Sequence, residues 1–312
     1  MVKLITSYYM DVPNYPYQGT ERMRTDRYLG SLKSHCTNLG YPIICYTHEK
    51  NLDELEKFKS DNKLENLIIK IRELSDMKLH KEISVVRDKF YDTNFNGRGM
   101  EIMWGKIDLM ERELDGTDYI YWIDIGLQHP GIFPWMYNDL YFDLIFHKFE
   151  NSEPPYWNDK QQTQYTFGKL FNKTIIDKII TLSKNKTFLI SINQPQCDFS
   201  GYVNNKICDE IGVPHIIGGV FGGDVQNFKH FINEFWYFAN KNIEYEFFST
   251  EESIMKMCYE NMDKNNFITF NFDVWQTNVH DEHHFEMWDV SWNKPKPFYV
   301  VFNDILKYSN NG

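Results

Sequence analysis

The sequence predicts an α/β protein built on a mostly parallel β-sheet flanked by helices. Apolar residues at 3–9, a helix-like stretch at 21–40 and a second apolar segment at 41–47 follow one another as strand, helix and strand. That order favours two parallel strands joined by a crossover helix. Residues 119–123, "YIYWI", are apolar or aromatic throughout and follow a helical segment. Such runs are typical of central parallel strands that helices cover on both faces.

The first half of the chain alternates between the two element types. In residues 21–40 apolar positions recur with the spacing of one helix face, and a glycine ends the pattern. Residues 51–66 predict a polar surface helix or a pair of helices, and residues 66–71 predict a third strand. Residues 72–99 are polar and irregular, which indicates a loop with a short helix. Residues 100–114 place apolar side chains on one face and predict the helix before the central strand.

The second half is less regular. Residues 187–192 and 266–272 predict strands, and residues 214–224 predict a strand that runs into two glycine pairs. Residues 225–240 and 249–262 have the pattern of helices. No internal repeat or linker divides the chain, so we predict a single domain.

Composition and charge exclude several classes of function. The formal net charge of the 312-residue chain is −11, and no basic stripe is present, so we expect no nucleic-acid partner. No run of about 18 apolar residues and no secretory leader pattern occurs, so we expect no integral membrane segment and a cytoplasmic location. The five cysteines are widely spaced without a CxxC pair, which favours reduced and mostly buried thiols.

The most informative single position is Asp124, which directly follows the central strand. In open parallel sheets, ligands bind beyond the carboxyl ends of the strands. A carboxylate there suits a hard divalent cation such as Mg²⁺ or Mn²⁺. The alternative is that Asp124 caps the turn that Gly126 forms. The local sequence leaves both interpretations open.

Five segments, in order, resemble one protein family. They are "ERMRTDRYLGSL" (21–32), "MWGKIDLM" (103–110), "YIYWIDIGLQHPGIFP" (119–134), "GGVFGGD" (218–224) and "TEESIMKM" (250–257). Their order and approximate spacing are similar to those of the bacterial HtrL/YibB and WlaTB-type family of glycosyltransferases. The resemblance extends over most of the chain.

This resemblance implies a GT-A-like single domain over residues 1–312. The nucleotide-binding half would cover about 1–130 and the acceptor-side half about 131–312. It implies a nucleotide-sugar donor, with a UDP-sugar as first choice, and a saccharide or glycoconjugate acceptor. The alternative is a non-catalytic protein that binds carbohydrate or nucleotide sugar. A Rossmann-type dehydrogenase or methyltransferase is disfavoured, because no glycine-rich turn follows the first strand.

The resemblance also implies a divalent metal, Mn²⁺ or Mg²⁺. The metal motif of this fold class is typically Asp-x-Asp, whereas here Gly126 takes the third position. Asp124 is then the single carboxylate of the motif. His280, from the cluster "VHDEHHFEMW" (279–288), is a second candidate ligand. A solvated polar loop is the alternative interpretation of that cluster.

An inverting transfer needs a general base, and a carboxylate is the usual choice. Asp224 and Glu251 are the candidates. Asp224 has a competing role as the N-cap of the helix at 225–240. Glu252 ranks lower because it completes a capping box with Ser249. A retaining enzyme would need no such base.

Six further residues are predicted donor contacts: Tyr8, Arg24, Arg27, Lys106, Gly219 and Gly222. The tyrosine ends the first strand and would stack on or hydrogen-bond the nucleotide base. The three cations would stabilise charge on the leaving diphosphate. The two glycines would let the backbone pass close to a sugar ring.

Overall fold

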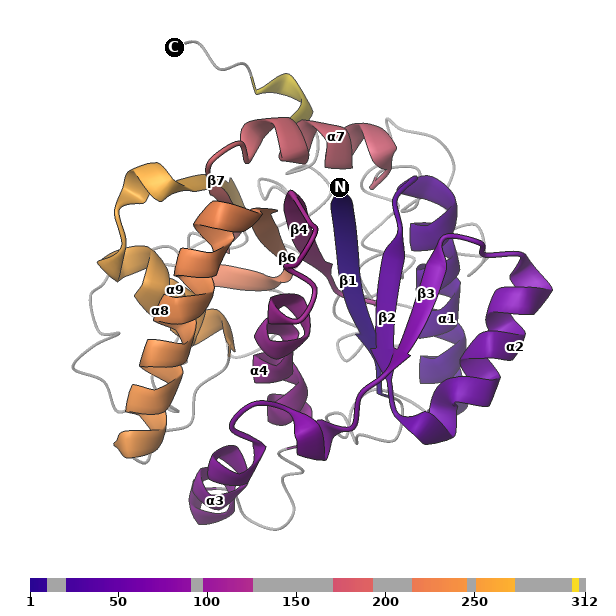
Figure 1. Cartoon of the computed structure of the whole chain (residues 1–312), viewed down its shortest axis with the longest axis horizontal. Coiled ribbons are helices and arrows are strands. Elements are labelled where there is room, and N and C mark those ends of the chain that lie inside the picture. The colour runs from indigo at the N-terminus through magenta and orange to yellow at the C-terminus, as the bar shows by residue number, and fades with distance from the viewer. Residues whose placement is uncertain are drawn as a thin grey trace, which may run out of the picture.

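A computed structural model describes residues 1–9, 21–90, 98–125, 171–192, 215–245, 251–272 and 305–308. Its centre is a seven-stranded sheet with the order β3-β2-β1-β4-β6-β5-β7 (Figure 1). The strands are β1 (Val2–Tyr8), β2 (Ile43–Thr47), β3 (Leu67–Ile71), β4 (Tyr119–Ile123), β5 (Thr187–Ile192), β6 (His215–Asp224) and β7 (Phe267–Phe272). Only β6 runs antiparallel to its neighbours. The predicted mostly parallel α/β sheet is therefore confirmed.

The helices of the described residues are α1 (Glu21–Asn38), α2 (Leu52–Asn62), α3 (His80–Phe90), α4 (Arg98–Glu111), α7 (Lys173–Leu182), α8 (Val225–Glu244) and α9 (Glu251–Asn261). Short 3₁₀ turns lie at Glu49–Asn51, Leu74–Asp76 and Lys264–Asn266. Figure 1 shows α1 and α2 beside β1–β3, with α8 and α9 towards the other end of the sheet. Within the described ranges, no helix combines the length and the apolar character needed to cross a membrane.

Helix α7 is absent from the elements predicted above. The side chain of Asn172 accepts hydrogen bonds from the backbone N–H groups of Thr174 and Ile175, which caps the helix. Its buried face is formed by Ile175, Ile176, Ile179 and Leu182. This spacing is a clear helical signal that is visible in the sequence.

Helices cover both faces of the sheet, because strand side chains alternate between two apolar cores. Ile120 and Trp122 of β4 face the core built with α4, α8 and α9. Tyr121 and Ile123 face the core built with α1, α2 and α7. A strand with both faces buried needs an unbroken apolar sequence, which explains "YIYWI".

The glycine-rich segment lies inside β6, the strand predicted over residues 214–224. Gly222 has a φ of +147° and is paired with Tyr121 of β4. A Cβ at Gly222 would overlap the backbone oxygen of Ile120, and one at Gly223 would overlap that of Lys186. The glycines therefore permit a close approach between neighbouring backbones.

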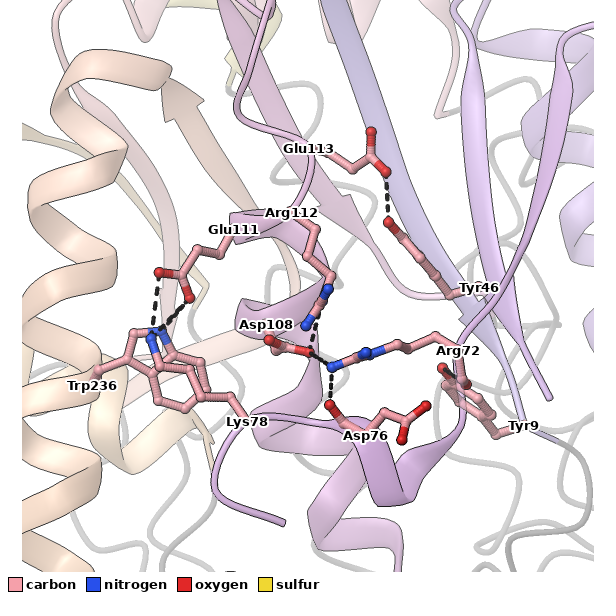
Figure 2. A network of polar contacts seen from close by, with 10 residues as sticks. All are labelled: Tyr9, Tyr46, Arg72, Asp76, Lys78, Asp108, Glu111, Arg112, Glu113 and Trp236. Carbon is pink, nitrogen blue, oxygen red and sulfur yellow. Dashed lines mark hydrogen bonds and ion pairs between the residues drawn. The ribbon is translucent and has the colours of Figure 1, made fainter.

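A polar network joins the last turn of α4 and the two residues after it to β2, to α8 and to the segment that follows β3 (Figure 2). Its contacts are Tyr46–Glu113, Arg72–Asp108 (3.4 Å), Arg112–Asp108 (3.2 Å), Lys78–Glu111 (3.1 Å) and Trp236–Glu111 (2.9 Å). An open depression of about 380 Å³ lies among its charged members. Each of its lining cations contacts an acidic partner within the network, so we interpret these residues as stabilising the fold.

Candidate functional site

The topology of the sheet identifies where a ligand would bind. From β1 the chain moves outward to β2 and β3, and it then returns to form β4 on the other side of β1. This reversal creates a switch point at the carboxyl ends of β1 and β4, where open α/β sheets bind ligands. Asp124 is the first residue after β4 and lies at that point.

Four neighbours hold Asp124. Its backbone N–H donates to the carbonyl oxygen of Gly219 at 2.8 Å. Its Oδ1 atom accepts from the indole N–H of Trp122 at 2.6 Å and lies 3.1 Å from Nζ of Lys106. Its backbone carbonyl lies 3.1 Å from Nε2 of His35. The side chain of Asp124 is nevertheless 41% exposed, and no described residue donates to Oδ2. One carboxylate oxygen in a fixed position is therefore available to a ligand.

Lys106, in the middle of α4, is enclosed by acceptors. Its Nζ atom lies 3.1 Å from Asp124 Oδ1, 2.7 Å from Glu251 Oε1 and 3.0 Å from the carbonyl of Gly218. Burial opposes its charge, but the carboxylates of Asp124 and Glu251 outweigh that effect and raise the pKa of Lys106. An ammonium group has three donors, and all three have acceptors here. All three donors of Lys106 therefore bind acceptors within the protein, and its contact with a diphosphate stays a prediction.

Glu251 begins α9, and its side chain is only 3% exposed. Its Oε1 atom binds Lys106, and its Oε2 atom is buried without a hydrogen-bond partner. Burial raises the pKa of Glu251, while Lys106 lowers it. A general base must reach the proton that it removes. In this arrangement Glu251 forms a buried ion pair with Lys106, and its role as a general base stays a prediction.

The contact between β6 and Glu251 requires a glycine at position 218. A Cβ at Gly218 would overlap the carboxylate of Glu251. The backbone N–H of Gly218 donates to Oε1 of Glu252 at 2.8 Å, while its carbonyl accepts from Lys106. The first turn of α9 is thereby bonded to β6 directly next to Gly219 and Asp124.

Asp224 lies away from this site. It pairs with Tyr119 at the start of β4, whereas Val220 pairs with Ile123 at its end. Four strand residues correspond to about 13 Å. Its carboxylate accepts from the backbone N–H groups of Gln226 and Asn227 and so caps α8. The structure favours this capping role over that of a general base.

Of the other predicted donor contacts, some lie near Asp124, some lie in the core and some are not described. Gly219 accepts a hydrogen bond from the backbone of Asp124, whereas Gly222 is enclosed by neighbouring strands; their contact with a sugar ring stays a prediction. Tyr8 is 1% exposed, and its hydroxyl donates to Glu54 at 2.9 Å, so its ring belongs to the core and is not open to a nucleotide base. The backbones of Arg24 and Arg27 lie in the N-terminal half of α1, and their side chains are not described. His280, Gly126 and Ser249 lie outside the described residues.

Sequence reasoning missed two residues that touch Asp124. Trp122 precedes it by two positions, and strand alternation places both side chains on the same face. His35 lies three residues after Leu32 on the buried face of α1, and a histidine in such a stripe is a recognisable signal. What the sequence does not provide is the pairing of α1 with the end of β4.

The titratable side chains of the site are mostly acidic. Three carboxylates, those of Asp124, Glu251 and Glu252, surround the single ammonium of Lys106. The unpartnered Oε2 of Glu251 adds to this excess of acceptors. No group of three or more histidine, cysteine, aspartate or glutamate side chains suited to a metal occurs within the described ranges. Asp124 combines a fixed position with an exposed side chain in this acidic cluster, and its role as a metal ligand stays a prediction.

Comparisons with known proteins add similarities of fold. No family model matches the chain, and no curated protein matches it. Among solved structures, the apo form of mouse xyloside xylosyltransferase 1 is similar with a TM-score of 0.46 and 10% identity, over 92% of this chain and 91% of that one. A 4-diphosphocytidyl-2C-methyl-D-erythritol synthase from Anaerococcus prevotii DSM 20548 is similar with a TM-score of 0.39 and 10% identity, over 94% of this chain and 96% of that one. Both TM-scores are below 0.5, so the case for a function rests on the site.

Proposed function

We propose that the protein is a glycosyltransferase that moves a sugar from a nucleotide-sugar donor to a saccharide or glycoconjugate acceptor. A UDP-sugar is the first candidate donor. The observation that carries the proposal is the partly exposed carboxylate of Asp124, held at the switch point of the sheet with no described residue donating to Oδ2. The ordered motifs that resemble a glycosyltransferase family support the same function.

The proposal includes a divalent cation, Mn²⁺ or Mg²⁺. Asp124 would hold it through Oδ2, and His280 remains a proposed second ligand. Hard cations of this kind accept carboxylate oxygens together with substrate phosphates, so the donor diphosphate would complete the site. When bound, the cation would stabilise negative charge on the departing nucleoside diphosphate.

The described residues serve this proposal by fixing Asp124. Lys106 keeps its positive charge next to Oδ1, which balances part of the acidic cluster without occupying Oδ2. The hydrogen bond from Trp122 orients the same oxygen. Electrostatic groups that are already oriented need little rearrangement during a reaction, which is the main advantage of such rigid sites. We assign no general base among the described residues.

Turnover tests the proposal. Purified protein is incubated with a panel of nucleotide sugars and Mn²⁺, and released nucleoside diphosphate is measured. We expect release from at least one donor, and we expect Asp124→Asn to reduce it. Asp61→Asn, which changes an exposed aspartate in α2, is the matched control and should leave release unchanged.

The same test distinguishes a glycosyltransferase from a non-catalytic binding protein. A carbohydrate- or nucleotide-sugar-binding protein would bind a donor without releasing nucleoside diphosphate, even when acceptor saccharides are added. If neither binding nor release occurs with any nucleotide sugar, the proposed function is wrong.

A further inference from the structure

We infer that His35 is a positioning residue that holds the backbone of Asp124, and with it the ligand-facing carboxylate, at the end of β4. The inference is tested below by two measurements, and only the second, the binding of UDP, rests on the proposed function. It assigns a role in the site to α1, the helix that also carries Arg24 and Arg27.

The contact has a defined chemistry. His35 is 1% exposed, and its Nε2 atom lies 3.1 Å from the carbonyl oxygen of Asp124. A carbonyl oxygen only accepts hydrogen bonds, so Nε2 must carry the proton. The other nitrogen, Nδ1, is buried and has no hydrogen-bond partner.

The position of the contact explains its importance. β4 ends at Ile123, and no backbone N–H of the described residues donates to the carbonyl of Asp124. Polar backbone groups in protein interiors require a partner. His35 supplies that partner from α1, whereas Lys106 reaches the side chain of Asp124 from α4, on the opposite face of the sheet. Asp124 is therefore held from both layers of helices.

An alternative interpretation is that the ring of His35 only fills space in the core. Its centroid lies 6.3 Å from that of the Phe171 ring. The two interpretations differ in what a substitution must preserve. A positioning role needs an N–H donor at the place of Nε2. Space filling needs only volume. Glutamine can place its amide nitrogen near that position, asparagine is too short to do so, and leucine has no donor.

The experiment compares His35→Gln, His35→Asn and His35→Leu with the parent protein. Cys36→Ala is the matched control, because Cys36 is buried in the same helix and has no contact with Asp124 among the hydrogen bonds and ion pairs given above. The first readout needs no ligand. It is the ¹⁵N–¹H resonance of the Trp122 indole, which donates to Asp124 Oδ1 and is assigned with Trp122→Phe. The second is the Kd of UDP with Mn²⁺, measured by calorimetry.

We expect His35→Leu and His35→Asn to shift the indole resonance and to weaken UDP binding at least tenfold, because small displacements of a positioned group have large effects. His35→Gln should resemble the parent in both readouts. Cys36→Ala should change only the melting temperature.

The inference is overturned if folded His35→Asn or His35→Leu keeps the parental indole resonance, or if His35→Gln behaves like them. Should His35→Leu fail to fold, the pair of Gln and Asn variants decides. If the parent binds no UDP, the proposed UDP specificity fails, while the indole resonance still tests the role of His35.

Discussion

The ammonium of Lys106 lies 2.7 Å from the carboxylate of Glu251, and both side chains are almost completely buried. This ion pair connects α4 to α9, and Lys106 extends the connection to Asp124. A buried pair is held together because either charge alone would be costly in the interior. The arrangement therefore predicts how the three residues respond when one of them is changed.

Removing Lys106 alone should be more harmful than removing the whole pair. Lys106→Met leaves Glu251 buried without a counterion, and we expect the free energy of unfolding to fall by about 3–5 kcal/mol. The double variant Lys106→Met/Glu251→Gln should recover much of that loss. Urea unfolding measures both, with Lys57→Met in the exposed pair with Asp61 as the control. A double variant that is less stable than Lys106→Met would contradict the ion pair.

Asp124→Asn should separate function from stability. The amide keeps an acceptor oxygen for Trp122, and Lys106 keeps Glu251 as a counterion, so we expect little change in melting temperature. Loss of the charge that faces the ligand should reduce turnover about tenfold to a hundredfold, which corresponds to about 1.5–3 kcal/mol. It should also weaken the Mn²⁺ dependence of nucleotide binding. Normal turnover with an unchanged response to Mn²⁺ would exclude Asp124 as the metal ligand.

Asp224→Ala tests the capping role against the catalytic one. The variant removes the acceptor for two backbone N–H groups at the start of α8, and we expect a loss of about 1 kcal/mol of stability. Turnover per folded molecule should stay unchanged, and Asp224→Asn should restore most of the stability. A large loss of turnover in a fully folded Asp224→Ala sample would instead support a catalytic role.

Gly222→Ala should damage the fold. The residue has a φ of +147°, and its Cβ would overlap the backbone of β4. Strain and overpacking together should lower the free energy of unfolding by about 3 kcal/mol or more. Gly116→Ala is the control, because Gly116 also has a positive φ, +66°, but has open space around it. Any activity of Gly222→Ala should fall in parallel with its folded fraction, and a stable but inactive variant would favour the ligand-lining role.

Stability should decrease between pH 6.5 and pH 4 in part because of His35. Burial lowers its pKa to about 4 in the folded protein, whereas the unfolded chain has a pKa of about 6.5. Above pH 6.5 both states are neutral at this site, and the contribution does not vary. As the pH falls, only the unfolded state binds the proton, which lowers the free energy of unfolding by up to about 3 kcal/mol.

The measurement is the pH dependence of urea unfolding for the parent and for His35→Gln. The glutamine variant lacks the titrating group, so its stability should decrease less over this range. Parallel curves would mean that His35 titrates normally in the folded state.

Several features of this protein were determined by the sequence alone. Apolar runs and helical periodicity were sufficient to place all seven strands and the helices α1, α2, α4, α8 and α9, because these patterns reflect which faces are buried. Asp124, Gly219, Lys106 and Glu251 were identified as site candidates from residue type and position at element ends. The structure brings these four residues together.

The contacts within that cluster were decided only by the tertiary structure. Lys106 was predicted to contact a diphosphate, and the structure shows its ammonium bonded to Asp124, Glu251 and Gly218. Glu251 was predicted as a general base, and the structure shows it buried in an ion pair. His35 joined the site only through the packing of α1 against the end of β4. The solvent exposure of a side chain and its hydrogen-bond partners depend on segments that are distant in the chain. Local sequence patterns therefore do not predict them.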